Sequence, residues 1–383
     1  MGVRLSSTLE NSPTTRPNAE VRVAAGEMRQ VGQITGMGIS YYDAILPVRA
    51  LRGDHARVVA GLRLPHRAAA SVLVPGGQIV VGFVSDSAGL AGMFADNWAQ
   101  AGTDQEPDAT LYALARPARS YGLDATWDGA RWWSQDGKTM IVFGFGSYRL
   151  VKVCVRGICS AVSADDILFL HGCALSVGGE NASRGVVVTG GSGAGKTTLV
   201  ARVLECAEHS VTVINDDWGA VSLSSGASAS TGERRLHMKS GSVLALRPDF
   251  FAGAPPGSYS YDLSEPDRTV RLLASPESVY GERWSTGTAV IRHLAVIVRE
   301  SPGWVPPGSK EEAFRFLRSG GNPVHLPRHE FFFDGSLILT TASDEQREED
   351  RYRRLLDHTA VSWINNCGSP ENLADSFMTA ILR

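Results

Sequence analysis

A glycine-rich turn between an apolar run and a helical run carries the clearest chemical signal in this chain. Residues 185–189 read Gly-Val-Val-Val-Thr, which is typical of a buried strand, and the residues after the turn continue with helical periodicity. The turn fills the pattern G-x-x-x-x-G-K-S/T with Gly190, Gly195, Lys196 and Thr197. Because backbone amides approach a polyphosphate closely only where side chains are absent, this pattern predicts a phosphate-binding loop.

The residues of this loop have separate chemical uses. Lys196 brings a positive charge to the terminal phosphates of a nucleotide, and the Thr197 hydroxyl is suited to complete the shell of a Mg²⁺ ion. The positive N-terminal end of the following helix adds to the attraction for phosphate. The sequence therefore predicts that ATP and Mg²⁺ bind here, with the choice of GTP left open. The expected binding residues are Gly190, Gly191, Ser192, Gly193, Ala194, Gly195, Lys196, Thr197 and Thr198.

Two adjacent aspartates follow the next apolar run, about twenty residues after the lysine. Residues 211–214 read as a buried strand, and Asp216 and Asp217 come just after it. In phosphate-loop enzymes an acid at this strand end holds or orients the metal. A second acid is suited to accept a proton from an attacking hydroxyl or to hold a second cation. The alternative is that one aspartate acts alone while the other caps a turn.

Length and composition set limits on the class of protein. The chain has 383 residues, 43% hydrophobic and 20% charged, which fits two domains or one elaborated domain. The net charge of −3 and the lack of a Lys/Arg run argue against nucleic-acid binding. No apolar run approaches the ~18 residues that span a bilayer, so we expect a cytoplasmic protein without membrane contact. The five cysteines form no C-x-x-C pair, which favours reduced thiols.

The composition shifts along the chain and predicts three parts. Residues 1–20 are rich in Ser, Thr, Asn and Pro and predict a disordered tail. Residues 21–160 predict a β-rich N-terminal domain that serves substrate or partner recognition. Residues 161–383 predict an α/β catalytic domain around the phosphate loop. Whether the chain forms a homo-oligomer stays open.

Turn residues and periodicity predict the elements of the N-terminal domain. A Pro-Gly-Gly turn at residues 75–77 separates two apolar strands. Two Asp-Gly turns, at residues 128–129 and 136–137, predict consecutive hairpins and hence a meander. Apolar residues at helical spacing predict a helix over residues 89–100.

The second half of the chain predicts alternating strands and helices. Strands are expected at residues 167–170, 173–177 and 211–214, and later at residues 294–298 and 336–340. Residues 222–232 are small and predict a loop. Helices are expected at residues 347–356 and 370–382.

Three motifs taken together resemble a known family. The step His171-Gly172, the loop from Gly190 to Thr198 and the pair Asp216-Asp217 stand in the order and spacing of the bacterial HPr kinase/phosphorylase catalytic domain. They are similar also to its shorter serine kinase relatives, in a superfamily that includes phosphoenolpyruvate carboxykinase. The resemblance covers about residues 165–225. It implies a mixed-sheet α/β fold with a phosphate loop, preceded in this chain by the β-rich domain.

The resemblance also implies roles for the site residues. Lys196 is expected to contact the terminal phosphates, while Thr197 and Asp216 bind Mg²⁺. Asp217 is expected to accept the proton of a substrate hydroxyl, and His171 to lie near the transferred phosphoryl group. The implied activity is transfer of the γ-phosphoryl group of ATP to an alcohol. The acceptor is a Ser/Thr side chain of a protein or peptide, or a small hydroxylated metabolite such as an amino acid.

The sequence departs from that family after the aspartates. Residues 233–240 read Glu-Arg-Arg-Leu-His-Met-Lys-Ser in place of a glycine-rich signature, so HPr is not the expected acceptor. Two alternatives to a kinase stay open: a carboxykinase-like lyase and a nucleotide-binding regulator without catalysis. A cation that stabilises transferred phosphoryl charge is expected among Arg271, Arg283 and Arg292. His237 and Lys239 are candidates for the acceptor site.

Overall fold

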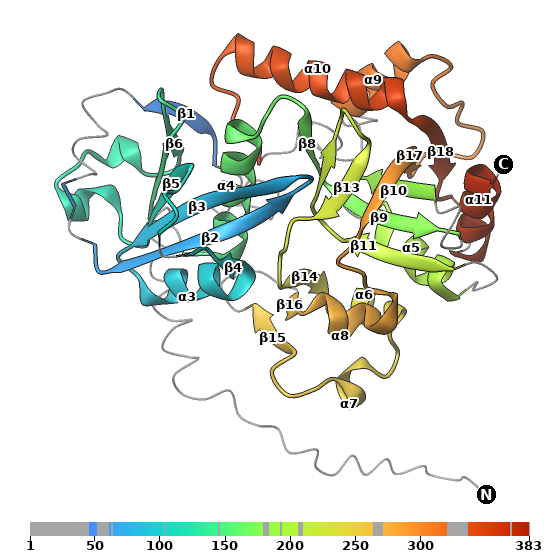
Figure 1. The fold of residues 1–383 in the computed structure, drawn as a ribbon, viewed down its shortest axis with the longest axis horizontal. Coiled ribbons are helices and arrows are strands. Elements are labelled where there is room, and N and C mark those ends of the chain that lie inside the picture. Colours follow the sequence, from blue (N-terminus) through green and yellow to red (C-terminus); the bar gives the residue numbers. More distant parts are fainter. Residues whose placement is uncertain are drawn as a thin grey trace, which may run out of the picture.

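The computed structural model shows an α/β protein with mixed sheets (Figure 1). The predicted tail at residues 1–20 lies outside the described residues, as do Ser192 and Gly193 of the phosphate loop. Within the part that is described, no helix is both long and apolar enough to cross a bilayer. The structure describes residues 46–51, 61–62, 64–102, 104–144, 146–178, 184–191, 194–205, 210–262, 271–319, 336–367 and 370–382.

The first seven strands form one mixed sheet in the order β1-β6-β7-β5-β3-β2-β4. Two helices, α3 (Ala88–Asn97) and α4 (Tyr148–Val162), pack on this sheet. Two 3₁₀ turns lie between β5 and β6 in the sequence, η1 (Ala118–Tyr121) and η2 (Ala125–Trp127). Helix α3 confirms the predicted helix, with Leu90 and Phe94 buried against the sheet. The strands are β1 (Val48–Leu51), β2 (His66–Val74), β3 (Gly77–Ser85), β4 (Ala99–Gln100), β5 (Ala109–Leu114), β6 (Arg131–Ser134) and β7 (Thr139–Phe143).

The strand pairing corrects the predicted meander. Hairpins form at residues 75–77 and 136–137 as predicted, but β3, β5 and β7 pair in parallel. The hairpin predicted at residues 128–129 is wrong. The Asp128 carboxylate accepts a hydrogen bond from the Ala118 amide at 2.8 Å and ties the end of η2 to the start of η1. An Asp-Gly pair determines only its own backbone, whereas α3 provides the crossover that parallel strands need.

The second large sheet has eight strands in the order β11-β9-β10-β17-β13-β12-β8, with β18 paired to β17. Strand β13 lies inside the stretch predicted to be a loop, so that prediction is wrong for these residues; β13 pairs with both β12 and β17. The strands are β8 (Ile167–Leu170), β9 (Gly172–Val177), β10 (Arg184–Gly190), β11 (Val211–Asn215), β12 (Gly219–Ser222), β13 (Ala227–Ser230), β17 (Thr288–Val298) and β18 (Ala360–Asn365).

Both faces of this sheet are covered by helices, which explains its continuous apolar strands. Val186 and Val188 of β10 pack toward helices α5 (Lys196–Glu205) and α11 (Pro370–Leu382). Val187, between them in the sequence, packs toward α9 (Lys310–Ser319) and α10 (Ala342–His358). The alternation follows from the two-residue period of a strand. The predicted helices at residues 347–356 and 370–382 correspond to α10 and α11.

A small third sheet lies below the junction of the two larger ones in Figure 1, in the order β14-β16-β15. The strand predicted at residues 336–340 is wrong. The Ser336 carbonyl accepts from the Arg131 guanidinium at 3.1 Å, so this backbone is held by a side chain instead of a sheet. The elements around the small sheet are β14 (Leu236–Lys239), α6 (Ser240–Leu246), α7 (Phe250–Gly253), β15 (Tyr259–Asp262), β16 (Arg271–Ala274), α8 (Pro276–Tyr280) and η3 (Gly281–Arg283).

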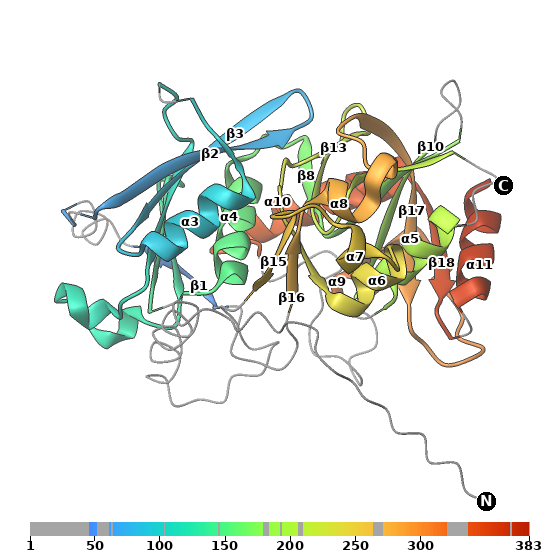
Figure 2. The same cartoon turned by 90° about the horizontal axis from the view of Figure 1, so that it is seen from below.

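Helix α4 lies between the two large sheets, as Figures 1 and 2 show from two directions. Val155 and Ile158 of α4 share one buried cluster with Phe169 of β8 and with Trp218. At Gly157 the helix comes so close to the chain that a Cβ atom would lie 2.3 Å from the Ser336 carbonyl oxygen. The absence of a side chain at residue 157 therefore sets how closely α4 packs.

We expect Gly157→Ala to lower the free energy of unfolding by about 1–3 kcal/mol, because the added methyl overlaps a backbone oxygen. Gly92→Ala is the matched control, since Gly92 is exposed within α3 and has no atom within 4 Å of an added Cβ. That control should gain roughly 0.5–1 kcal/mol from helix propensity. Urea unfolding of both variants tests the difference, and equal stabilities would contradict the close packing.

Candidate functional site

The three sequence motifs meet at one edge of the second large sheet. Strands β10 and β11 both run antiparallel to β9, which lies between them, so their carboxyl ends reach the same edge. His171 stands at that edge because β9 begins at the next residue. The Thr189 hydroxyl donates to the His171 carbonyl at 3.0 Å and ties the histidine to the end of β10.

Close contacts, and at one position a positive φ, require glycine at two positions of the phosphate loop. A Cβ atom at Gly190 would lie 2.6 Å from the carbonyl oxygen of Ile297 on β17. Gly195 has a φ of +111° and would bring a Cβ to 2.4 Å from Nδ2 of Asn366. That same Nδ2 donates to the Ala194 carbonyl at 2.7 Å. Asn366 holds the loop from the end of β18 and is not among the residues predicted from the sequence.

Lys196 lies over the loop that it follows. Its Nζ donates to the carbonyl oxygens of Gly190 at 2.6 Å and of Gly191 at 3.4 Å. Thr197 and Thr198 are half-buried in the first turn of α5, which carries no acidic residue. The positive end of α5 is therefore not opposed by a carboxylate of its own first turn.

The adjacent aspartates have different partners. Asp217 has a φ of 70° and is the one non-glycine residue with positive φ in the described part of the chain. Its carboxylate lies 2.5 Å from Nη2 of Arg156 and 3.4 Å from Nε2 of His171. Asp216 accepts instead from the Tyr280 hydroxyl at 2.6 Å and from the Asp217 amide at 2.9 Å. The left-handed backbone lets two neighbouring carboxylates reach opposite sides.

The two surroundings shift the two pKa values in opposite directions. Desolvation opposes ionisation of Asp217, but the nearby Arg156 and Lys152 cations and the hydrogen bond from His171 outweigh it and hold its pKa well below the usual range. Desolvation raises the pKa of Asp216, and the Tyr280 hydrogen bond offsets only part of that effect. Asp217 is therefore a firmly ionised, weak base, and Asp216 is the more basic carboxylate.

A buried ion cluster joins α4 to the acid pair. Nη2 of Arg156 lies 3.1 Å from Glu233, and Nζ of Lys152 lies 2.8 Å from Glu233 and 3.5 Å from Asp217. Only 4% of the Glu233 and Lys152 side chains is exposed. Two cations thus balance two carboxylates, which such burial requires. We refer to Lys152, Arg156, Asp217 and Glu233 as the ion cluster.

The cation that contacts the acid pair is not one of the three predicted from the sequence. Arg283 donates to the carbonyl of Val211, Arg292 is exposed on β17, and the Arg271 side chain lies outside the described residues. Arg156 contacts the acid pair instead. Its signal in the sequence is the spacing of Lys152 and Arg156, four residues apart in a largely apolar helical run that also contains Arg149, which places both charges on one face of the helix.

The remaining predicted residues belong to the acceptor site and to the metal site. His237 packs against Tyr148 with ring centroids 5.7 Å apart, and the Lys239 side chain lies outside the described residues. Among the residues described, no three His, Cys, Asp or Glu side chains are grouped to hold a metal ion. A Mg²⁺ site built from Thr197, Asp216, phosphate oxygens and water needs no such group.

Comparison with known proteins assigns no family. No protein-family model matches the chain, and no curated protein matches it. The function therefore has to be argued from the chemistry of the site.

We expect Arg156→Met to lower the free energy of unfolding by about 3–5 kcal/mol, because it leaves buried carboxylate charge without its main partner. Glu233→Gln should also destabilise the protein. The double variant should lose less stability than the sum of the two single variants. Urea unfolding of the four proteins should give a coupling free energy of about 1–3 kcal/mol between Arg156 and Glu233.

The control cycle uses Lys310→Met and Asp357→Asn, an ion pair of 3.3 Å whose side chains are 58% and 65% exposed. Its coupling should stay below about 1 kcal/mol. Equal couplings for the buried and the exposed pair would contradict the role of the ion cluster.

Proposed function

We propose that this protein is an ATP- and Mg²⁺-dependent phosphotransferase with an alcohol as acceptor, built on an HPr kinase-like phosphate-loop fold. The observation that carries the proposal is that Lys196 and its loop open onto the sheet edge where His171 lies 3.4 Å from Asp217. A phosphate cradle and an ionised carboxylate held beside it are the two parts that transfer to a hydroxyl requires.

The loop and the first turn of α5 supply the nucleotide site in this proposal. Lys196 exchanges the Gly190 and Gly191 carbonyl oxygens for terminal phosphate oxygens, which its flexible chain allows. Thr197 and Asp216 are the residues that would hold Mg²⁺, since hydroxyl and carboxylate oxygens are the ligands it prefers. Bound Mg²⁺ supplies positive charge that neutralises the terminal phosphates.

Asp217 orients the acceptor hydroxyl and takes its proton. Its low pKa makes it a weak base, yet phosphoryl transfer passes through a loose transition state that needs positioning more than base strength. Arg156 and Lys152 hold the carboxylate from one side and His171 from another. Arg156 is therefore a positioning residue, which acts on the reaction through Asp217.

We expect Lys196→Ala to weaken binding of Mg·ATP and to abolish phosphoryl transfer, with a loss of about 100-fold or more, because the loop loses its one side-chain cation. Titration calorimetry and transfer from γ-labelled ATP measure the two effects. Lys138→Ala, an exposed lysine in the turn between β6 and β7, is the matched control and should behave like the parent protein. Persistent transfer by Lys196→Ala would refute the proposed function.

We expect Asp217→Asn to reduce transfer by about 10²–10⁴-fold while nucleotide affinity survives, because the carboxylate acts on the hydroxyl and not on the nucleotide. Labelled product is followed in a cell extract separated by size, which also assigns the acceptor to small molecules or polypeptides. Asp350→Asn on the exposed side of α10 is the control. A regulator that only binds nucleotide would show no transfer in any variant, including the parent protein.

A further inference from the structure

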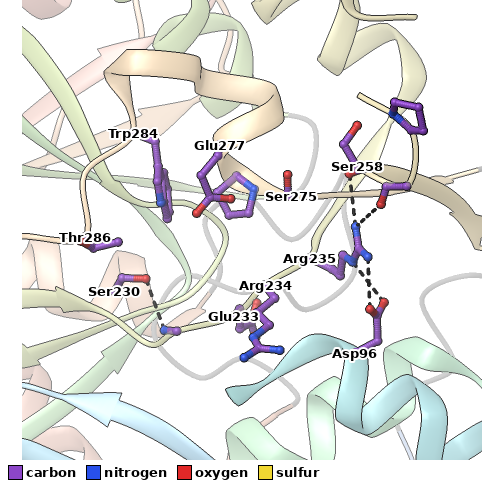
Figure 3. A pocket seen from close by; sticks show the side chains of 14 residues that line it. Asp96, Ser230, Glu233, Arg234, Arg235, Ser258, Ser275, Glu277, Trp284 and Thr286 are labelled. Carbon is purple, nitrogen blue, oxygen red and sulfur yellow. Dashed lines mark hydrogen bonds and ion pairs between the residues drawn. The ribbon is translucent and has the colours of Figure 1, made fainter. Parts of the chain in front are cut away.

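A cavity of about 540 Å³ lies at the junction of three parts of the chain. Asp96 at the end of α3 contributes one wall, residues 230–235 a second, and residues 256–258 with α8 a third. Trp284 closes one side (Figure 3). The volume is that of a site for a small molecule. We call it the Trp284 cavity.

Two lining residues connect this cavity to the acid pair. Nη2 of Arg156 contacts a carboxylate oxygen of Glu233 at 3.1 Å and one of Asp217 at 2.5 Å. These two oxygen atoms are therefore at most 5.6 Å apart. On the other side the Trp284 ring stacks on Tyr280 at 6.0 Å, and the Tyr280 hydroxyl donates to Asp216. Two lining residues of the Trp284 cavity are therefore each separated from the acid pair by one intervening side chain, Arg156 on one side and Tyr280 on the other.

Most charges of the lining are already balanced within the protein. Asp96 pairs with Arg235 through two contacts of 3.1 Å, and Glu233 belongs to the ion cluster. Glu277 on α8 and Arg234 are different, since neither side chain has an ion pair or hydrogen bond with any described residue. Figure 3 shows Glu277 beside Trp284 and Arg234 across the cavity from it. One carboxylate and one guanidinium are thus available to a ligand.

We propose that the Trp284 cavity binds the phosphoryl acceptor and that this acceptor is a free amino acid with a side-chain hydroxyl. Glu277 takes its ammonium group, Arg234 takes its carboxylate, and the hydroxyl extends past Glu233 to Asp217. A residue inside a polypeptide has neither terminal charge and would leave both side chains unmatched. The inference rests on the proposed function and adds the class of the acceptor.

The group transfer balances with ATP as the donor. The hydroxyl oxygen forms a bond to the γ-phosphorus, and the bond from that phosphorus to the β–γ bridging oxygen breaks. The hydroxyl proton goes to the Asp217 carboxylate, and ADP leaves with the bond's electron pair. The product is a phosphoamino acid with its ammonium and carboxylate groups unchanged.

The test uses the full chain, Mg·ATP and five alcohols: L-serine, L-threonine, L-homoserine, glycerate, which lacks the ammonium, and ethanolamine, which lacks the carboxylate. At least one amino acid should be phosphorylated with a lower KM than either analogue. Glu277→Gln should raise KM about tenfold for that amino acid and for ethanolamine but not for glycerate. Arg234→Gln should raise it for that amino acid and for glycerate but not for ethanolamine.

Two surface variants control for unspecific charge effects. Glu282→Gln and Arg119→Gln remove exposed charges that do not line the cavity, and they should leave every KM unchanged. Transfer to polypeptides with none of the five alcohols labelled would overturn this inference and leave the proposed function standing. Unchanged KM values in Glu277→Gln and Arg234→Gln would overturn it as well. If the parent protein does not bind Mg·ATP, the proposed function itself is refuted.

Discussion

The contact between Arg156 and Asp217 is the interaction on which the rest of the site depends. Helix α4 packs against the N-terminal sheet, while Asp217 lies in the turn between β11 and β12 of the second sheet. The ion cluster therefore links the two sheets. Buried charges without partners cost several kcal/mol each, which holds the four side chains of the cluster together. Gly157 permits this arrangement, because any side chain there would push α4 away from the Ser336 backbone.

The acid pair illustrates how adjacent, chemically identical residues acquire different properties. The cations around Asp217 hold its pKa low and keep it ionised, whereas burial raises the pKa of Asp216 by more than its hydrogen bond from Tyr280 lowers it. Environments that separate the pKa values of paired carboxylates commonly assign them separate tasks. The positive φ of Asp217 produces the separation, since it turns consecutive carboxylates toward α4 and toward Tyr280. The roles proposed for them follow their positions and not the order of their pKa values, since Asp217 is the carboxylate that lies beside His171.

The proposed site combines a nucleotide part that is held within one sheet with an acceptor part whose walls come from several segments. The phosphate loop is held from β17 and β18, both inside one sheet, through the close contact at Gly190 and the Asn366 amide. The Trp284 cavity instead draws its walls from α3, the β13–β14 connection, residues 256–258 and α8. Acceptor specificity can therefore change by substitutions in surface segments without disturbing the strand, loop and helix that are proposed to hold the nucleotide.

The sequence by itself determined the local features: the strand–turn–helix around residues 185–205, the acid pair after a buried strand, and a helix that was predicted over residues 89–100 and ends at Asn97 in the structure. These depend on periodicity and on glycine spacing within a few residues. The tertiary structure decided the parallel order of β3, β5 and β7, the choice of Arg156, 61 residues from Asp217, and the anchor Asn366, 172 residues from Ala194. Such partners are selected by packing between distant segments, and local patterns do not encode which segments meet.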